Sequence, residues 1–246
     1  MSEHSGETTI LRQGTFVAGG RAVDAGRGWA WIADGWGVFK KSPGLWIGMI
    51  VVLLLIFFAL SLIPLIGMVA ATILQPVFGA GLMIACRKID VGEPPLFSDL
   101  FAGFQTQFGR MATLGALYLA GTVVMVGAGV LVGGVGILSL GAGSPGPEAA
   151  SAFLLAALVI MALAVPVAMA FWFAVPLALF NEQGPVDALK SSFTGCLRNI
   201  VPFLLYGVIG IVLAFVASIP FGLGWLLLGP VFVASIYTGY KDVYLS

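Results

Sequence analysis

Residues 42–86, SPGLWIGMIVVLLLIFFALSLIPLIGMVAATILQPVFGAGLMIAC, contain no charged side chain. The hydrocarbon core of a bilayer is about 30 Å thick and is spanned by roughly 20 apolar helical residues, so this run is long enough for two spans. Pro64, between Ser61 and Gly67, marks the turn, because proline removes a backbone donor and disfavours helix in the residue before it. The run therefore predicts a transmembrane helical hairpin.

Three further charge-free runs follow, at 111–147, 149–181 and 199–240. The glycine- and proline-rich stretch 141–147 is typical of a loop, and Pro220 with Gly222 and Gly224 divides the last run. The sequence predicts an all-α polytopic membrane protein whose six transmembrane helices form three hairpins. The predicted spans lie near 45–63, 65–86, 111–135, 151–177, 201–219 and 224–240.

The composition supports this fold class. Hydrophobic residues make up 60% of the 246 residues and charged residues only 9%, with a mean hydropathy of +1.08. Soluble domains average about 25% charged residues. The net charge of zero leaves no basic excess to hold a nucleic acid. The two cysteines are far apart, which excludes a disulfide framework and a CxxC metal or redox site.

The basic residues predict the orientation. With six spans, all eleven fall on one side of the membrane: Arg12, Arg21, Arg27, Lys40, Lys41, Arg87, Lys88, Arg110, Lys190, Arg198 and Lys241. The positive-inside rule then places both termini in the cytoplasm. Residues 1–22 lack the apolar segment of a signal peptide, so we expect a disordered cytoplasmic tail before a membrane domain at 23–246.

Each hairpin is preceded by a short amphipathic stretch, at 27–41, 96–108 and 185–198. Apolar residues recur there at spacings of three and four, which predicts helices lying in the headgroup plane. The expected interfacial anchors are Trp29, Ile32, Trp36, Phe39, Phe97, Phe101, Phe104 and Phe193. The unit of surface helix, span, turn and span then occurs three times, either as a true repeat or by coincidence in a narrow apolar alphabet.

Several residues inside the spans suggest kinks or close packing. The expected kinks lie at Gln75 with Pro76, and at Pro166, Pro176 and Pro230. The Gln75 amide would either satisfy a backbone group freed by Pro76 or bind a substrate, with packing favoured. Gly129 and Gly133 form a small-xxx-small pair, which lets helices approach closely.

The sequence offers few residues that could take part in catalysis. The predicted spans hold no ionisable residue at mid-depth, although such residues usually mark ion paths or catalytic sites. The single histidine, His4, lies in the predicted tail, so neither a Ser-His-Asp triad nor a Cys-His pair is assembled. We therefore expect no catalytic residues, no metal, no cofactor and no enzyme activity.

Two functions fit these features. The favoured one is a non-enzymatic membrane component that organises lipid or a protein partner through its amphipathic helices. The alternative is an uncoupled permease or channel-like carrier for a small neutral or amphiphilic solute. Expected partners are membrane lipids, with a second copy of the chain or another membrane protein as further candidates, and no nucleic acid.

The run from Arg21 to Ile32, with its AGRGW motif at 25–29, resembles the opening of an uncharacterised family of bacterial multi-pass membrane proteins. The similarity continues through Gly35-Trp36, Pro43, Trp46, residues 75–83 and residues 100–104. It implies a bacterial inner-membrane protein with no established activity to transfer. The layout also resembles the membrane domain attached to some glycerophosphodiesterases, but the phosphodiesterase domain is absent here.

Overall fold

The computed structural model describes residues 15–141 and 147–246, and the regular structure in this part of the chain is helical, as predicted. An isolated bridge pairs Phe16 with Leu245. The elements are α1 (Arg27–Lys41), α2 (Pro43–Ser61), α3 (Ile66–Asp90), the 3-10 helix η1 (Phe97–Phe101), α4 (Ala102–Thr106), α5 (Phe108–Gly141), α6 (Pro147–Trp172), α7 (Ala174–Phe180), α8 (Pro185–Arg198), α9 (Ile200–Ser218) and α10 (Trp225–Tyr244).

Five segments of the described chain are long and apolar enough to cross a membrane. They are α2, α3, most of α5, the combined α6 and α7, and α9. The sixth predicted span, 224–240, does form a helix, α10, but falls outside this set. Its second half carries Thr238, Lys241 and Asp242 among tyrosines, which lowers its hydropathy. The structure thus supports a multi-pass helical protein without establishing six spans.

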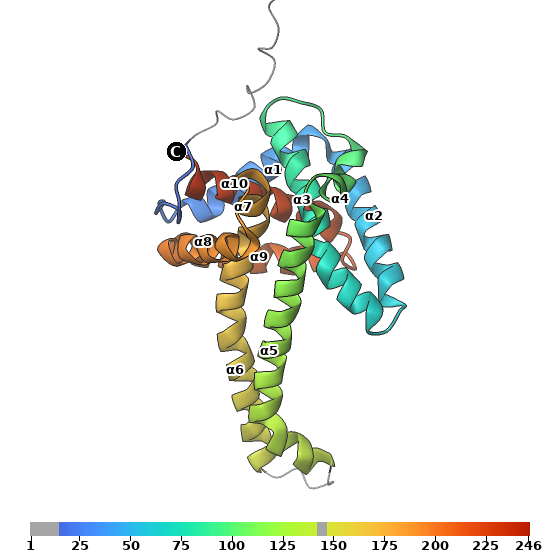
Figure 1. Ribbon diagram of the computed structural model, residues 1–246, viewed down its shortest axis with the longest axis vertical. Helices are drawn as coiled ribbons and strands as arrows, with labels where there is room; N and C mark the ends of the chain where they lie inside the picture. Colours follow the sequence, from blue (N-terminus) through green and yellow to red (C-terminus); the bar gives the residue numbers. More distant parts are fainter. Residues whose placement is uncertain (1–14, 142–146) are drawn as a thin grey trace, which may run out of the picture.

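The three predicted hairpins pack in different ways. Helices α5 and α6 contact each other directly and extend along the long axis of the molecule, well beyond the turns of the other hairpins (Figure 1). Helices α1, α8 and α10 run across that axis near one end (Figure 1). Helices α9 and α10 touch each other less than each touches α1. The hairpins are therefore not packed as three equivalent repeats.

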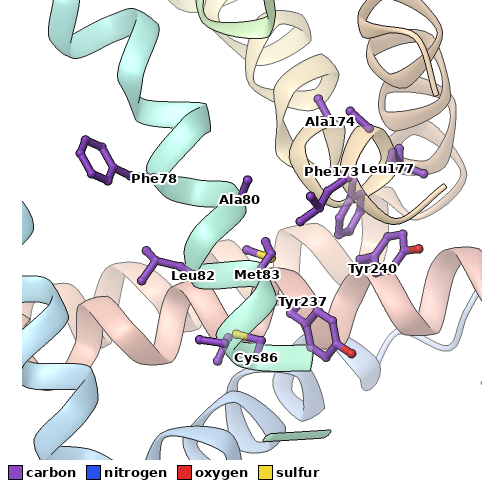
Figure 2. Packing of buried hydrophobic residues seen from close by; sticks show 14 of the residues in the cluster. Phe78, Ala80, Leu82, Met83, Cys86, Phe173, Ala174, Leu177, Tyr237 and Tyr240 are labelled. Atoms are coloured by element: carbon purple, nitrogen blue, oxygen red, sulfur yellow. The ribbon is translucent and has the colours of Figure 1, made fainter. Parts of the chain in front are cut away.

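The hydrophobic core lies where α1, α3, α7 and α10 converge. Figure 2 shows Met83 and Cys86 of α3 facing Leu177 of α7 and Tyr237 and Tyr240 of α10. By contrast, only 11% of the apolar window of α5 and 6% of that of α6–α7 are buried within the chain. The apolar surface of the α5–α6 hairpin is thus left to face lipid.

The predicted span at 151–177 is interrupted at Phe173, three residues before the expected kink at Pro176. The hydroxyl of Ser192, from α8, inserts into the backbone ladder there. It accepts a hydrogen bond from the Phe173 N–H at 2.9 Å and donates one to the Met169 carbonyl at 2.7 Å. A side chain inserted between residues i and i−4 is a recognised cause of a helix break. In contrast, helices α3, α6 and α10 continue through Pro76, Pro166 and Pro230, respectively.

The surface helix predicted at 96–108 is not continuous. It divides into η1, α4 and the first residue of α5, with Gln107 outside any helix. The Asp99 carboxylate accepts a hydrogen bond from the Leu96 N–H at 2.8 Å and pairs with Lys88 at 2.6 Å. These bonds of Asp99 hold the segment against the end of α3. The segment therefore does not form the continuous helix that its apolar periodicity predicts.

The disordered tail predicted at 1–22 is wrong for residues 15–22, whereas residues 1–14, with His4 and Arg12, lie outside the described chain. The N–H groups of Thr15, Val17 and Arg21 donate to the carbonyls of Ser246, Tyr244 and Val243 at 2.8–3.1 Å. The Asn199 amide also binds the Arg21 carbonyl at 2.8 Å. We call this pairing of the two ends the terminal clasp. It places residues 15 and 246 side by side.

Candidate functional site

Helix α1 is the element around which the candidate site is built. One face of this helix is buried against α9 and α10, and its members are Gly28, Trp31, Ile32, Gly35 and Phe39. The remaining circumference splits into an aromatic flank with Trp29 and Trp36 and a charged flank with Arg27, Asp34 and Lys41. Each flank lines a separate groove.

Two glycines allow α1 to lie against its neighbours at backbone distance. A Cβ added to Gly28 would lie 2.1 Å from the carbonyl oxygen of Pro202 in α9. A Cβ added to Gly35 would lie 2.7 Å from the carbonyl oxygen of Val231 in α10. Any larger residue at either position would push the helices apart. This pair is not among the residues predicted from the sequence, although the two glycines are seven residues apart and so lie on one helical face.

The aromatic flank of α1 forms one wall of an apolar groove of about 530 Å³. Helix α9, the turn after it and the first half of α10 form the other wall. We call this the apolar groove; it is lined by Trp29, Ile32, Ala33, Trp36, Leu213, Val216, Ala217, Pro220, Gly224, Leu227, Leu228 and Val231. Trp29 is 52% exposed and Trp36 44% exposed, so both indoles are accessible from the surroundings of the protein.

The other flank of α1 lines a second groove, of about 460 Å³, in which cations and anions are equal in number. We call this the charged groove; it is lined by Arg27, Ala33, Asp34, Gly37, Val38, Lys41, Asp90, Thr238, Lys241 and Asp242. Ala33 belongs to both grooves. The apolar groove and the charged groove therefore adjoin at the middle of α1.

Ion pairs fix most charges in the charged groove. The Arg27 Nε donates to the Asp242 carboxylate, which also accepts a 2.8 Å hydrogen bond from the Trp31 indole N–H. The hydrogen bond to Asp242 raises the pKa of Arg27, against the opposing effect of partial burial. The Lys241 ammonium binds both carboxylate oxygens of Asp90 at 2.6 and 2.7 Å.

Two charges of this groove are engaged less closely. Asp34 lies 3.4 Å from an Arg27 nitrogen, and the Lys41 ammonium lies 3.4 Å from the Ile89 carbonyl oxygen. Asp34 and Lys41 are seven residues apart and share one side of the helix. One anion and one cation on α1 are thus the least tightly held charges of the charged groove.

The residues expected as interfacial anchors do not form one class. Ile32 and Phe39 are core residues, at 4% and 3% exposure, on the face of α1 that packs against its neighbouring helices. Trp29 and Trp36 line the apolar groove, as described above. The other aromatic residues are Phe97, Phe101 and Phe104, which are exposed, and Phe193, which is half-buried. The rings of Phe101 and Phe104 pack edge-on against Phe78 of α3.

The remaining highlighted residues lie away from the two grooves. Gln75 is exposed, and its side chain makes no hydrogen bond within the described part of the chain. Gly129 and Gly133 lie on the face of α5 that meets α6, where added Cβ atoms would lie 2.5 Å from Ile160 and 2.8 Å from Ala156. In residues 15–141 and 147–246, no three His, Cys, Asp or Glu side chains are grouped to hold a metal.

Comparisons with known proteins give one informative match. The chain is 34% identical over 216 residues to a protein of Burkholderia thailandensis described as a probable inner membrane protein. The matched part covers 83% of this chain and 79% of that protein. The sequence matches no family model, and no solved structure matches.

Proposed function

The chain belongs to the family of this probable inner membrane protein of Burkholderia thailandensis, and from this premise we propose that it holds a membrane phospholipid along α1. The protein is a multi-pass protein of the inner membrane. In the proposal, an acyl chain occupies the apolar groove and the polar headgroup lies at the charged groove. This makes the protein a non-enzymatic component that organises lipid.

The single observation that carries the proposal is the adjacency of the two grooves at Ala33. A phospholipid joins an apolar chain to a charged headgroup, and the surface of α1 offers contacts of both kinds on either side of Ala33. Trp29 and Trp36 support the same assignment, because tryptophan is enriched where hydrocarbon meets headgroups. The balanced charges of the groove match a headgroup that carries both signs better than a purely anionic one.

The proposed orientation has both termini in the cytoplasm. The described cations lie at Arg21, on α1, at the end of α3, near the start of α5, on α8 and at the end of α10, all toward the end of the molecule where the termini meet (Figure 1). The positive-inside rule assigns that end to the cytoplasm. The terminal clasp holds residues 15 and 246 together, which supports an even number of membrane crossings between them.

The lipid proposal is tested by filling the junction of the grooves with Ala33→Trp. Ala33 is exposed, so the added ring occupies groove space without entering the core. Loss of contact with about two methylenes, at ~0.8 kcal/mol each, corresponds to roughly tenfold weaker retention of phospholipid. The measurement is phospholipid per protein after purification in mild detergent, quantified by mass spectrometry.

Ala157→Trp, on the exposed surface of α6, is the matched control and should retain the lipid content of the unmodified chain. Equal lipid in Ala33→Trp and the control would contradict the proposal. The carrier hypothesis predicts solute flux in proteoliposomes, whereas the lipid-holding role predicts none above protein-free liposomes. Recovery of a protein partner or of a second copy in place of lipid would assign the groove to protein binding.

A further inference from the structure

Helices α9 and α10 lie alongside α1 rather than alongside the long α5–α6 hairpin. At the base of α9, the backbone of Pro202 meets Gly28 near the start of α1. At the other end, the turn residues Pro220 and Gly224 line the apolar groove together with Trp36 of α1. Helix α1 therefore follows the α9–α10 hairpin from its base toward its turn, and in Figure 1 α1 and α10 run across the axis of α5 and α6.

The charges of α1 fix its depth in the membrane. Arg27 lies in its first turn and Lys41 in its last, with Asp34 and Lys40 between them. Arg27 and Lys41 both line the charged groove, together with Asp242 from the C-terminal end of the chain. Charged side chains are costly inside hydrocarbon, so both ends of α1 lie at one membrane surface. The helix is then parallel to that surface, and the hairpin packed against it is held near the same surface.

The α9–α10 turn is built to remain in hydrocarbon. Its side chains Ile219, Phe221 and Leu223 are exposed and apolar, and Phe221 is fully exposed. Every backbone N–H from Ile219 to Leu228 donates to a backbone carbonyl of the same hairpin, apart from Pro220, which has none. The Trp225 indole N–H donates to the Ser218 hydroxyl at 3.1 Å. Backbone donors without partners are what exclude irregular turns from lipid, and this turn leaves none.

We propose that α9–α10 is a re-entrant hairpin that enters and leaves the bilayer on the side of the termini. Its partner is the acyl-chain region of that one leaflet. Helix α9 is long and apolar enough to cross, but its neighbour α1 holds it near the surface. Only the α2–α3 and α5–α6 hairpins then cross the membrane, so the number of crossings is even. The proposal does not depend on lipid in the apolar groove.

The experiment is cysteine accessibility in the full-length chain, with Cys86→Ala and Cys196→Ser as the background. Phe221→Cys reports on the hairpin turn. Ala150→Cys, exposed at the start of α6, reports on the far end of the α5–α6 hairpin, and Lys190→Cys, exposed on α8, reports on the side of the termini. Intact spheroplasts are treated with a membrane-impermeant maleimide, and the labelled fraction is measured by mass shift.

We expect rapid labelling of Ala150→Cys and labelling of Phe221→Cys at least about tenfold slower, because hydrocarbon excludes the charged reagent. Labelling of Phe221→Cys at the rate of Ala150→Cys would overturn the proposal, since the turn would then reach the periplasm. This outcome would not affect the retention of a phospholipid. The re-entrant hairpin and the lipid-holding role can therefore be disproved independently.

A second readout distinguishes a turn in the near leaflet from one buried close to the far surface. A fluorophore is attached to Phe221→Cys with a lipid-soluble maleimide, and a nitroxide lysolipid is added to one face of oriented vesicles. Quenching should be stronger when the lysolipid enters the leaflet on the side of the termini. Stronger quenching from the opposite leaflet would overturn the re-entrant hairpin.

Discussion

Cys196 shows how burial controls reactivity at the scale of one residue. Its side chain lies between α8 and α6 at 2% exposure, with the thiol 3.5 Å from the Met169 carbonyl oxygen. Burial raises the pKa of this thiol to about 12, against a smaller lowering by Ser192. Because the thiolate is the reacting species, a raised pKa leaves almost none of it at pH 8. Such a thiol is also a poor acceptor for an acyl group.

We therefore predict slow alkylation of Cys196 in a Cys86→Ala chain. At pH 8, iodoacetamide should react with Cys196 at least about a hundredfold more slowly than with an exposed cysteine whose pKa is about 8.5. The labelled fraction is followed by mass spectrometry against Lys190→Cys in a chain without the two native cysteines. Comparable rates for the two thiols would show that Cys196 is accessible and not buried.

At the scale of the element, the contact of α1 with α10 depends on one glycine. A Cβ at Gly35 would lie 2.7 Å from the Val231 carbonyl oxygen and 2.9 Å from the Ser235 nitrogen, and both are backbone atoms, which shift less easily than the end of a flexible side chain. Gly35→Ala should therefore lower the free energy of unfolding by about 1–3 kcal/mol, the usual range for overpacking. A lower midpoint of thermal unfolding in detergent is the measurement.

Gly37→Ala is the matched control, because nothing lies within 4 Å of the added Cβ in the same helix. Alanine is the better helix former by roughly 0.5–1 kcal/mol, so this variant should be as stable as the unmodified chain or more so. If Gly35→Ala and Gly37→Ala unfold at the same temperature, α1 does not pack against α10 as described.

The positions of the long apolar helices were predictable from the sequence, because charge-free runs and proline-marked turns are local features. The packing of α9 and α10 was not predictable, because the hydropathy of a segment does not show which helices lie beside it. The break at Phe173 depends on Ser192, and the depth of α9 depends on Gly28. Both partners are distant in sequence. The charged groove was not predictable for the same reason, since Arg27 and Asp242 lie near opposite ends of the sequence.

At the scale of the whole molecule, the terminal clasp joins the first and last described residues. The hydroxyl oxygens of Thr15 and Ser246 lie 2.8 Å apart, and Arg198 donates to the Gly20 carbonyl at 2.5 Å. Thr15→Cys with Ser246→Cys should thus form a disulfide on mild oxidation, since cysteines at such a separation meet the geometric needs of the bond. Non-reducing electrophoresis after cleavage between the two positions is the measurement.

The same chain with Thr15→Cys and Ala150→Cys, the latter at the far end of the α5–α6 hairpin (Figure 1), should stay uncrosslinked under identical oxidation. If the Thr15→Cys and Ser246→Cys pair also remains reduced, the two ends of the chain are not held together. The even number of crossings would then lose its structural support.

The proposed lipid-holding role depends most on where the phospholipid is bound. Native membranes containing a photoactivatable phospholipid, with the reactive group on the acyl chain, allow the contact to be located by mass spectrometry of cross-linked peptides. We predict preferential cross-linking to α1 around Trp29 and Trp36 and to those residues between 213 and 231 that line the apolar groove. Cross-links spread evenly over the exposed surfaces of α5 and α6, without enrichment at α1, would show that the apolar groove does not hold a phospholipid.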